Sequence, residues 1–128
     1  MTLDPQSFAA AWLAAWNAHD VEAVLAHFHE DAVFTSPFAA SLFPESGGRL
    51  AGKQAIRDYW TAGLARVPDL RFTLDTLFVG MDCLVIAYVN QKQVRVSEVL
   101  KFAGDLVIEG HGTYPANAVN PVGAGTAA

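Results

Sequence analysis

Residues 94–114 read VRVSEVLKFAGDLVIEGHGTY, and they alternate apolar with polar side chains on either side of a short turn at residues 103–105. Because successive side chains of a β-strand point to opposite faces, the first half places five residues on one face: Val94, Val96, Glu98, Leu100 and Phe102. Residues 106–114 form the second strand. The stretch therefore predicts a β-hairpin with one apolar face that carries a single carboxylate, Glu98.

Strand-like sequence continues upstream of this hairpin. Apolar side chains alternate with more polar ones at four positions between residues 70 and 78: Leu70, Phe72, Leu74 and Phe78. A turn with Gly80 and Asp82 follows, and residues 84–90 are apolar on both faces until Asn90. The second half of the chain thus predicts an antiparallel sheet.

Helical periodicity dominates the N-terminal half. Asp4 followed by Pro5 is a typical helix start, and Trp12 and Trp16 share one face of the helix that we expect over residues 4–18. Asp20 begins a second helix, expected over residues 20–31.

A short strand at residues 32–36 follows and ends at Pro37. Residues 37–52 indicate a long loop and residues 53–67 a third helix, which Pro68 ends. Helices followed by strands are typical of an α+β fold, in which helices cover one face of an antiparallel sheet. We expect an apolar pocket between the two layers.

The length of 128 residues is typical of one domain. We expect that domain over residues 1–114, followed by a mobile tail over residues 115–128, which contain no charge and no aromatic ring. The hydrophobic content of 52% exceeds what a single core needs and hints at a second buried surface, such as a cavity or a dimer interface.

The net charge of −5 makes nucleic acid and anionic membranes poor partners. The single cysteine, Cys83, has no internal disulfide partner, and the N-terminus shows no signal peptide. No apolar run is long enough for a membrane span. We expect a cytoplasmic protein.

The order of elements resembles the nuclear transport factor 2-like superfamily, in particular its SnoaL-like, ketosteroid-isomerase-like branch. Three segments carry the resemblance: AAWNAHDVEAVLAHFHEDAVF near the start, GKQAIRDYW with PDLRF in the middle, and SEVLKF with GDLVIEGHGTY at the end. The resemblance implies a cone-shaped domain in which three N-terminal helices lie on the concave face of a curved antiparallel sheet and enclose a pocket. It also implies a homodimer that packs through the outer sheet face.

Two positions depart from the enzymes of this branch. Ketosteroid-isomerase-like members carry an aspartate base before the proline that ends the first strand, and this chain has Ser36 there. A serine hydroxyl does not accept a proton near neutral pH. Related cyclases and epoxide hydrolases carry an aspartate on the last strand, and that position falls on His111 or Gly112, depending on a gap at Gly104.

Glu98 is the main candidate for proton transfer, because a carboxyl group on an apolar strand face loses hydration and its pKa rises. His111 on the next strand is a second candidate and would pair with Glu98 as a carboxylate–imidazole unit. The alternative for both residues is structural: Glu98 hydrogen-bonded to Tyr59, Tyr88 or His111, and His111 a satisfied polar residue at a sheet end.

Aromatic and polar residues are expected to form the pocket around Glu98, and the candidates are Trp12, Trp16, Ser36, Phe38, Tyr59, Trp60, Tyr88 and Asn90. A phenol such as Tyr59 or Tyr88 would also donate to a carbonyl oxygen. The cluster at residues 27–31 is a weak metal signal, because side chains two apart on a helix point to different faces. We expect no metal and no cofactor.

Two hypotheses of function follow from these residues. In the first, the protein is a non-catalytic module that binds a small apolar molecule in the pocket. In the second, it is a cofactor-free isomerase, cyclase or hydrolase, in which Glu98, with His111 or a tyrosine, moves protons. The serine at position 36 favours the first hypothesis or a chemistry outside the known ones.

The strands between residues 70 and 100 also predict a homodimer. They carry apolar residues on both faces, with Leu77 and Val79 opposite the face of Phe72 and Phe78, and the helices cover one face only. Light scattering at micromolar concentration should therefore give the mass of a dimer. A monomer mass at that concentration would contradict this prediction.

Overall fold

Six strands form one sheet in residues 1–116, the part of the chain that a computed structural model describes. They are β1 Phe28–Thr35, β2 Arg49–Ala51, β3 Thr73–Gly80, β4 Cys83–Val89, β5 Arg95–Ala103 and β6 Leu106–Thr113, in the order β2-β1-β6-β5-β4-β3. Neighbouring strands are antiparallel except β1 and β6, which are parallel. The sheet is therefore mixed, not wholly antiparallel as predicted. The predicted tail falls outside the described residues from position 117 onward.

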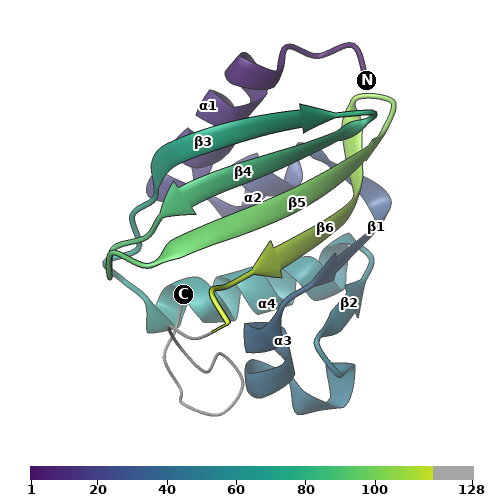
Figure 1. The fold of residues 1–128 in the computed structure, drawn as a ribbon. Coiled ribbons are helices and arrows are strands. Elements are labelled where there is room, and N and C mark those ends of the chain that lie inside the picture. The colour runs from purple at the N-terminus through teal and green to yellow at the C-terminus, as the bar shows by residue number, and fades with distance from the viewer. Residues whose placement is uncertain (117–128) are drawn as a thin grey trace.

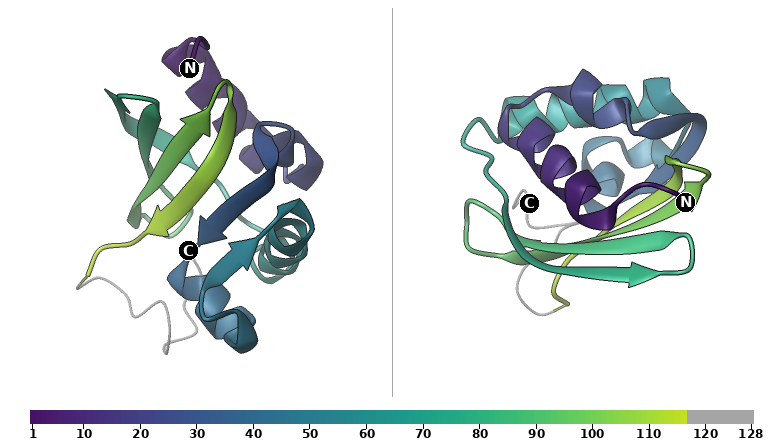
Figure 2. Two further views of the ribbon diagram at one scale, coloured as in Figure 1. Left: turned by 90° about the vertical axis from the view of Figure 1, so that its right-hand side faces the viewer. Right: turned by 90° about the horizontal axis from the view of Figure 1, so that it is seen from above.

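Helices lie on one side of the curved sheet, as Figures 1 and 2 show. They are α1 Pro5–Asn17, α2 Val21–Leu25, α3 Pro37–Leu42 and α4 Lys53–Arg66, with a 3₁₀ turn η1 at Pro44–Ser46. The side chains of Asp4 and Asp20 cap α1 and α2 by accepting hydrogen bonds from backbone N–H groups of the first turn. No helix in residues 1–116 is long and apolar enough to cross a membrane. The predicted α+β fold is confirmed.

The segment between α1 and α4 differs from the prediction in two places. The second helix ends at Leu25, and residues 28–31 belong to β1, because Phe28 is buried and pairs with Val107 of β6. The predicted loop at residues 37–52 contains α3 and β2. Ser36 caps α3, since its Oγ accepts from the N–H of Phe38, and Pro37 occupies the first helical position.

A register shift in β3 reverses the faces expected for its second half. The pairing with β4 is irregular between Leu74 and Thr76, so that Leu77 pairs with Ile86 and turns towards the core. Phe78 then points outward and is 56% exposed. Such a bulge adds one residue to a strand and moves every later side chain to the other face.

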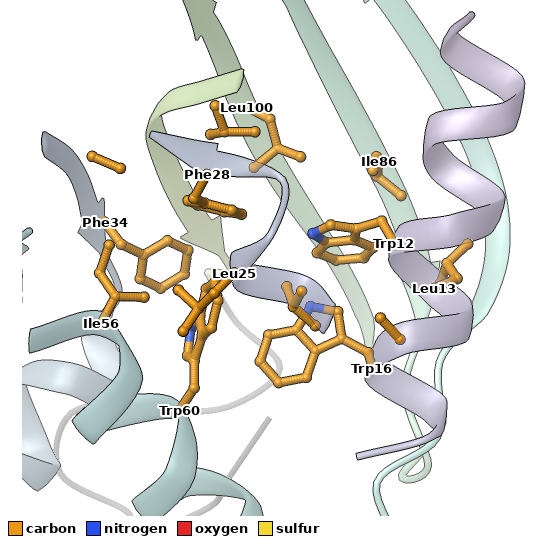
Figure 3. Close-up of a cluster of buried hydrophobic side chains, with 14 of the residues drawn as sticks. Trp12, Leu13, Trp16, Leu25, Phe28, Phe34, Ile56, Trp60, Ile86 and Leu100 are labelled. Atoms are coloured by element: carbon orange, nitrogen blue, oxygen red, sulfur yellow. The ribbon is translucent and has the colours of Figure 1, made fainter. Parts of the chain in front are cut away.

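The core between helices and sheet combines aromatic and aliphatic side chains (Figure 3), and contacts between aromatic rings run across it. Trp16 of α1 contacts Trp60 of α4 edge to face, with ring centroids 4.9 Å apart. Trp12 stacks on Phe72 at 6.2 Å, and Phe72 lies 4.1 Å from Tyr88 of β4. These contacts join both long helices to the inner face of the sheet.

Candidate functional site

A cavity of about 410 Å³ opens between the helices and the inner face of the sheet, a volume in the range of small-molecule sites. Its apolar walls are Trp16, Phe34, Phe38, Leu42, Trp60, Leu64, Val67, Leu70 and Phe72. Its polar side chains are Ser36, Ser41, Tyr59, Arg66, Tyr88, Glu98 and Tyr114, and Gly63 completes the lining. The cavity is thus mostly apolar with a few polar groups.

Glu98 lies on the cavity wall, on the inner face of β5, and is 7% exposed. The hydroxyl of Tyr88 donates a hydrogen bond to Glu98 Oε1 at 3.1 Å, and Oε2 has no partner among the described residues. Loss of hydration on burial raises the pKa of Glu98 to about 7, although the Tyr88 hydrogen bond acts in the opposite direction. Both the protonated and the ionised form of this carboxyl group are therefore accessible near neutral pH.

Three tyrosines bring hydroxyl groups to the cavity. Tyr88 donates to Glu98, and Tyr59 of α4 donates to Ser36 Oγ at 3.3 Å. Burial raises the pKa of Tyr59 to about 12, and burial also raises the pKa values of Tyr88 and Tyr114 well above the usual range. All three phenols consequently stay protonated at neutral pH and remain hydrogen-bond donors.

Gly112, not His111, occupies the position on β6 that faces the cavity. Gly112 pairs with Glu98 across the strands, and a Cβ atom at Gly112 would lie 3.7 Å from Glu98 Oε1. The reason is a register shift between β5 and β6 at Lys101 and Phe102, which reverses the faces of β6 relative to simple alternation.

His111 lies on the outer face of the sheet. Its Nδ1 is 2.6 Å from Thr35 Oγ1, and its Nε2 is 3.3 Å from Glu109 Oε1. The predicted pair of Glu98 and His111 is therefore wrong. No group of three or more His, Cys, Asp or Glu side chains within residues 1–116 is arranged to hold a metal ion.

Two other predicted pocket residues lie elsewhere. Trp12 is 2% exposed in the core, where it stacks on Phe72, and does not line the cavity. Asn90 shapes the turn after β4, because its Oδ1 accepts from the N–H groups of Lys92 and Val94. The remaining six predicted pocket residues do line the cavity: Trp16, Ser36, Phe38, Tyr59, Trp60 and Tyr88.

Ten residues of the cavity lining were not predicted as site residues, among them Tyr114, Gly63 and Arg66. Tyr114 lines the cavity and stands two residues after Gly112, on the same inner side of the chain, and this position follows only once the register shift in β6 is known. Gly63 and Arg66 follow Tyr59 on α4 at i+4 and i+7, so helical spacing from Tyr59 is a signal that would have found both.

The raised pKa of Glu98 predicts a specific pH dependence of stability. Glu98 holds its proton to higher pH in the folded protein, about 7, than its ordinary value of 4.5 allows in the unfolded chain. Its contribution is fully present below pH 4.5 and is lost as pH rises through about 7. We expect the free energy of unfolding to fall by about 3 kcal/mol over this interval, and Glu98→Gln to remove that fall.

Urea unfolding of wild type and variant between pH 4 and 8 measures this difference, and carboxyl titration by NMR gives the pKa of Glu98 directly. Glu109→Gln is the matched control, because the hydrogen bond from Lys101 lowers the pKa of the partly exposed Glu109 instead. A difference between wild type and Glu98→Gln that does not change with pH would contradict the prediction.

Comparison with solved structures places the fold among small α+β proteins of several bacteria. A SnoaL-like protein of unknown function from Burkholderia thailandensis E264 is 34% identical, with a TM-score of 0.81 over 87% of this chain and 93% of that one. TerC co-crystallized with polyporic acid is 17% identical, with a TM-score of 0.69 over 88% of this chain and 92% of that one. A hypothetical protein with a ketosteroid isomerase-like fold from Catenulispora acidiphila DSM 44928, in complex with trimethylamine, is 16% identical, with a TM-score of 0.69 over 91% of each chain.

No curated protein matches the chain in a sequence comparison. The family model of the SnoaL-like domain, in contrast, matches residues 9–114, which include every strand of the sheet and all the aromatic residues of the core and of the cavity wall except Phe8. The chain belongs to the SnoaL-like family.

Proposed function

We propose that this protein binds a small, mostly apolar organic molecule in the cavity, through an oxygen atom of the ligand that reaches Glu98. The observation that carries the proposal is the carboxyl oxygen Oε2 of Glu98, which is buried in the cavity wall and has no partner among the described residues. An unsatisfied buried polar atom costs roughly 1–3 kcal/mol. A ligand group that hydrogen-bonds to Oε2 removes this cost.

The chemistry of the walls supports an apolar ligand with few polar atoms. Nine apolar side chains line the cavity, and the phenol groups of Tyr59, Tyr88 and Tyr114 are donors at neutral pH. A protonated Glu98 donates to a ligand oxygen, and an ionised Glu98 accepts from a ligand hydroxyl. The complexes of the similar folds with polyporic acid and trimethylamine also support the binding of small organic molecules.

A second candidate function is cofactor-free acid–base catalysis on a bound carbonyl or epoxide compound, as in an isomerase, a cyclase or a hydrolase. The pKa of Glu98, about 7, favours this candidate, because a group with a pKa near the operating pH both accepts and donates protons efficiently. Tyr59 would polarise the oxygen of the substrate. His111 takes no part, because it lies on the outer face.

The predicted homodimer remains part of this proposal. Phe78, Val85 and Val99 form a cross-strand row on the outer face of the sheet, and no helix of residues 1–116 covers that face (Figure 2). Phe78 takes the place in this surface that was expected for Leu77. Phe78 is exposed and the two valines are half-buried, and an apolar row of this kind is typical of an interface between copies of a chain.

Binding is tested with 2-tetralone and 2-naphthol, two bicyclic compounds with one oxygen atom, by isothermal titration calorimetry. We expect saturable binding of one molecule per chain. Leu42→Trp, which places a larger ring in the cavity wall, should weaken this binding. Leu106→Trp, at an exposed position outside the cavity lining, should not. Absence of saturable binding by any such compound would contradict the proposal.

Catalysis is tested by the exchange of the C1 protons of 2-tetralone for deuterium in D₂O, which reports proton abstraction whatever the natural product is. If Glu98 acts as the base, the rate should rise as pH increases through about 7, because the carboxylate is the active form. Glu98→Gln should lower the rate to the buffer level, a loss of about 10²–10⁴-fold for a general base. Glu109→Gln should leave it unchanged. Equal rates for wild type and Glu98→Gln would exclude this role.

A further inference from the structure

Arg66 places one positive charge at the mouth of the cavity. It is the only cation among the described residues that line the cavity, it is exposed, and its guanidinium group forms no ion pair or hydrogen bond with any residue between 1 and 116. Glu98, the only other lining residue that can ionise near neutral pH, is buried in the wall. The cavity therefore has a cationic outer end and a carboxyl group at its inner wall.

Gly63 is a second unusual feature of the same wall. It lies inside α4 with an ordinary helical backbone rather than a positive φ, and a Cβ atom built on it would meet nothing within 4 Å. Neither conformation nor packing thus requires a glycine, although glycine inside a helix is unfavourable relative to alanine. Gly63 lies between Tyr59 and Arg66 on one stripe of the helix, and all three line the cavity. What the glycine provides is free space along that stripe.

We propose that the ligand is an apolar organic acid, whose carboxylate binds Arg66 at the mouth while its apolar body lies over Gly63 and carries the oxygen atom that reaches Glu98. This inference rests on the proposed function and names the ligand class. An arginine binds a carboxylate through two parallel N–H donors, which also fixes the orientation of the ligand. The space over Gly63 lets the ligand body approach the helix backbone closely.

A position in the last turn of a helix by itself favours an arginine, because the cation interacts with the helix dipole. That interaction explains the charge of Arg66 but not the glycine one turn earlier. Two fields oppose an anion at this site: the negative end of the α4 dipole and the net charge of −5. Salt screens distant charges over roughly 8 Å, whereas a direct contact with the guanidinium group is screened much less.

The experiment compares hydroxylated acids with their primary amides, 6-hydroxy-2-naphthoate with 6-hydroxy-2-naphthamide and 3-(4-hydroxyphenyl)propionate with 3-(4-hydroxyphenyl)propionamide, by calorimetry at pH 7.5. We expect each acid to bind about three- to tenfold more tightly than its amide, as for a partly exposed charge-assisted pair. The preference should shrink in 0.5 M NaCl. Arg66→Gln should abolish it, and Arg71→Gln, a matched change at an exposed site outside the lining, should leave it intact.

The variant Gly63→Ala tests whether Gly63 serves ligand binding or the stability of the helix. It should raise the melting temperature of the free protein by about 2–6 °C through helix propensity. It should also weaken the binding of acid and amide by about tenfold, because the added methyl group occupies ligand space. Thr61→Ala, at an exposed position of the same helix, should raise the melting temperature without changing binding.

The outcomes distinguish this inference from the proposed function. Equal affinity of acid and amide for the wild type, or an unchanged preference in Arg66→Gln, overturns the role of Arg66 and leaves small-molecule binding in place. If Gly63→Ala binds the ligands as tightly as the wild type does, the inference that the ligand body lies over Gly63 is wrong. If neither acids nor amides bind the wild type, the proposed function itself fails.

Discussion

The edge-to-face contact between Trp16 and Trp60 holds the two long helices at the distance that the cavity requires. Their ring centroids are 4.9 Å apart, and Trp16 also contacts Phe72 at 5.8 Å on the side of the sheet. Both tryptophans belong to the buried core and to the cavity wall at once. Because large aromatic rings pack with few allowed geometries, this one contact stabilises the fold and shapes the space that Glu98 faces.

The parts of the site that follow from local pattern could be predicted from sequence. β5 pairs with β4 without interruption from Arg95 to Lys101, so strict alternation correctly placed Glu98 on the buried face. The same is true of Tyr59 and Trp60, which helical spacing assigned to the inner side of α4. In a regular helix or strand, the spacing of residues in the sequence determines directly which face each side chain occupies.

The parts that depend on irregular pairing could not be predicted in the same way. A bulge reverses every later side chain of its strand, and it arises from contacts between strands that no local pattern reveals. For this reason Gly112, and not the predicted His111, lies on the inner face of β6. In β3, Leu77 lies on the inner face, where Phe78 was predicted. The prediction of a helix over residues 28–31 was wrong for a related reason, since the pairing of β1 with β6 overrides the helical periodicity of these residues.

The parallel pairing of β1 with β6 has a consequence for the order in which the chain folds. β6 lies between β1 and β5, and the paired residues Thr35 and His111 are 76 positions apart. Strands β3 to β6 assemble through local hairpins, whereas β1 and β2 join them only after a long loop has closed. Contacts of such sequence separation slow folding. On the ribosome, the sheet therefore stays in two pieces until its last strand has been synthesised.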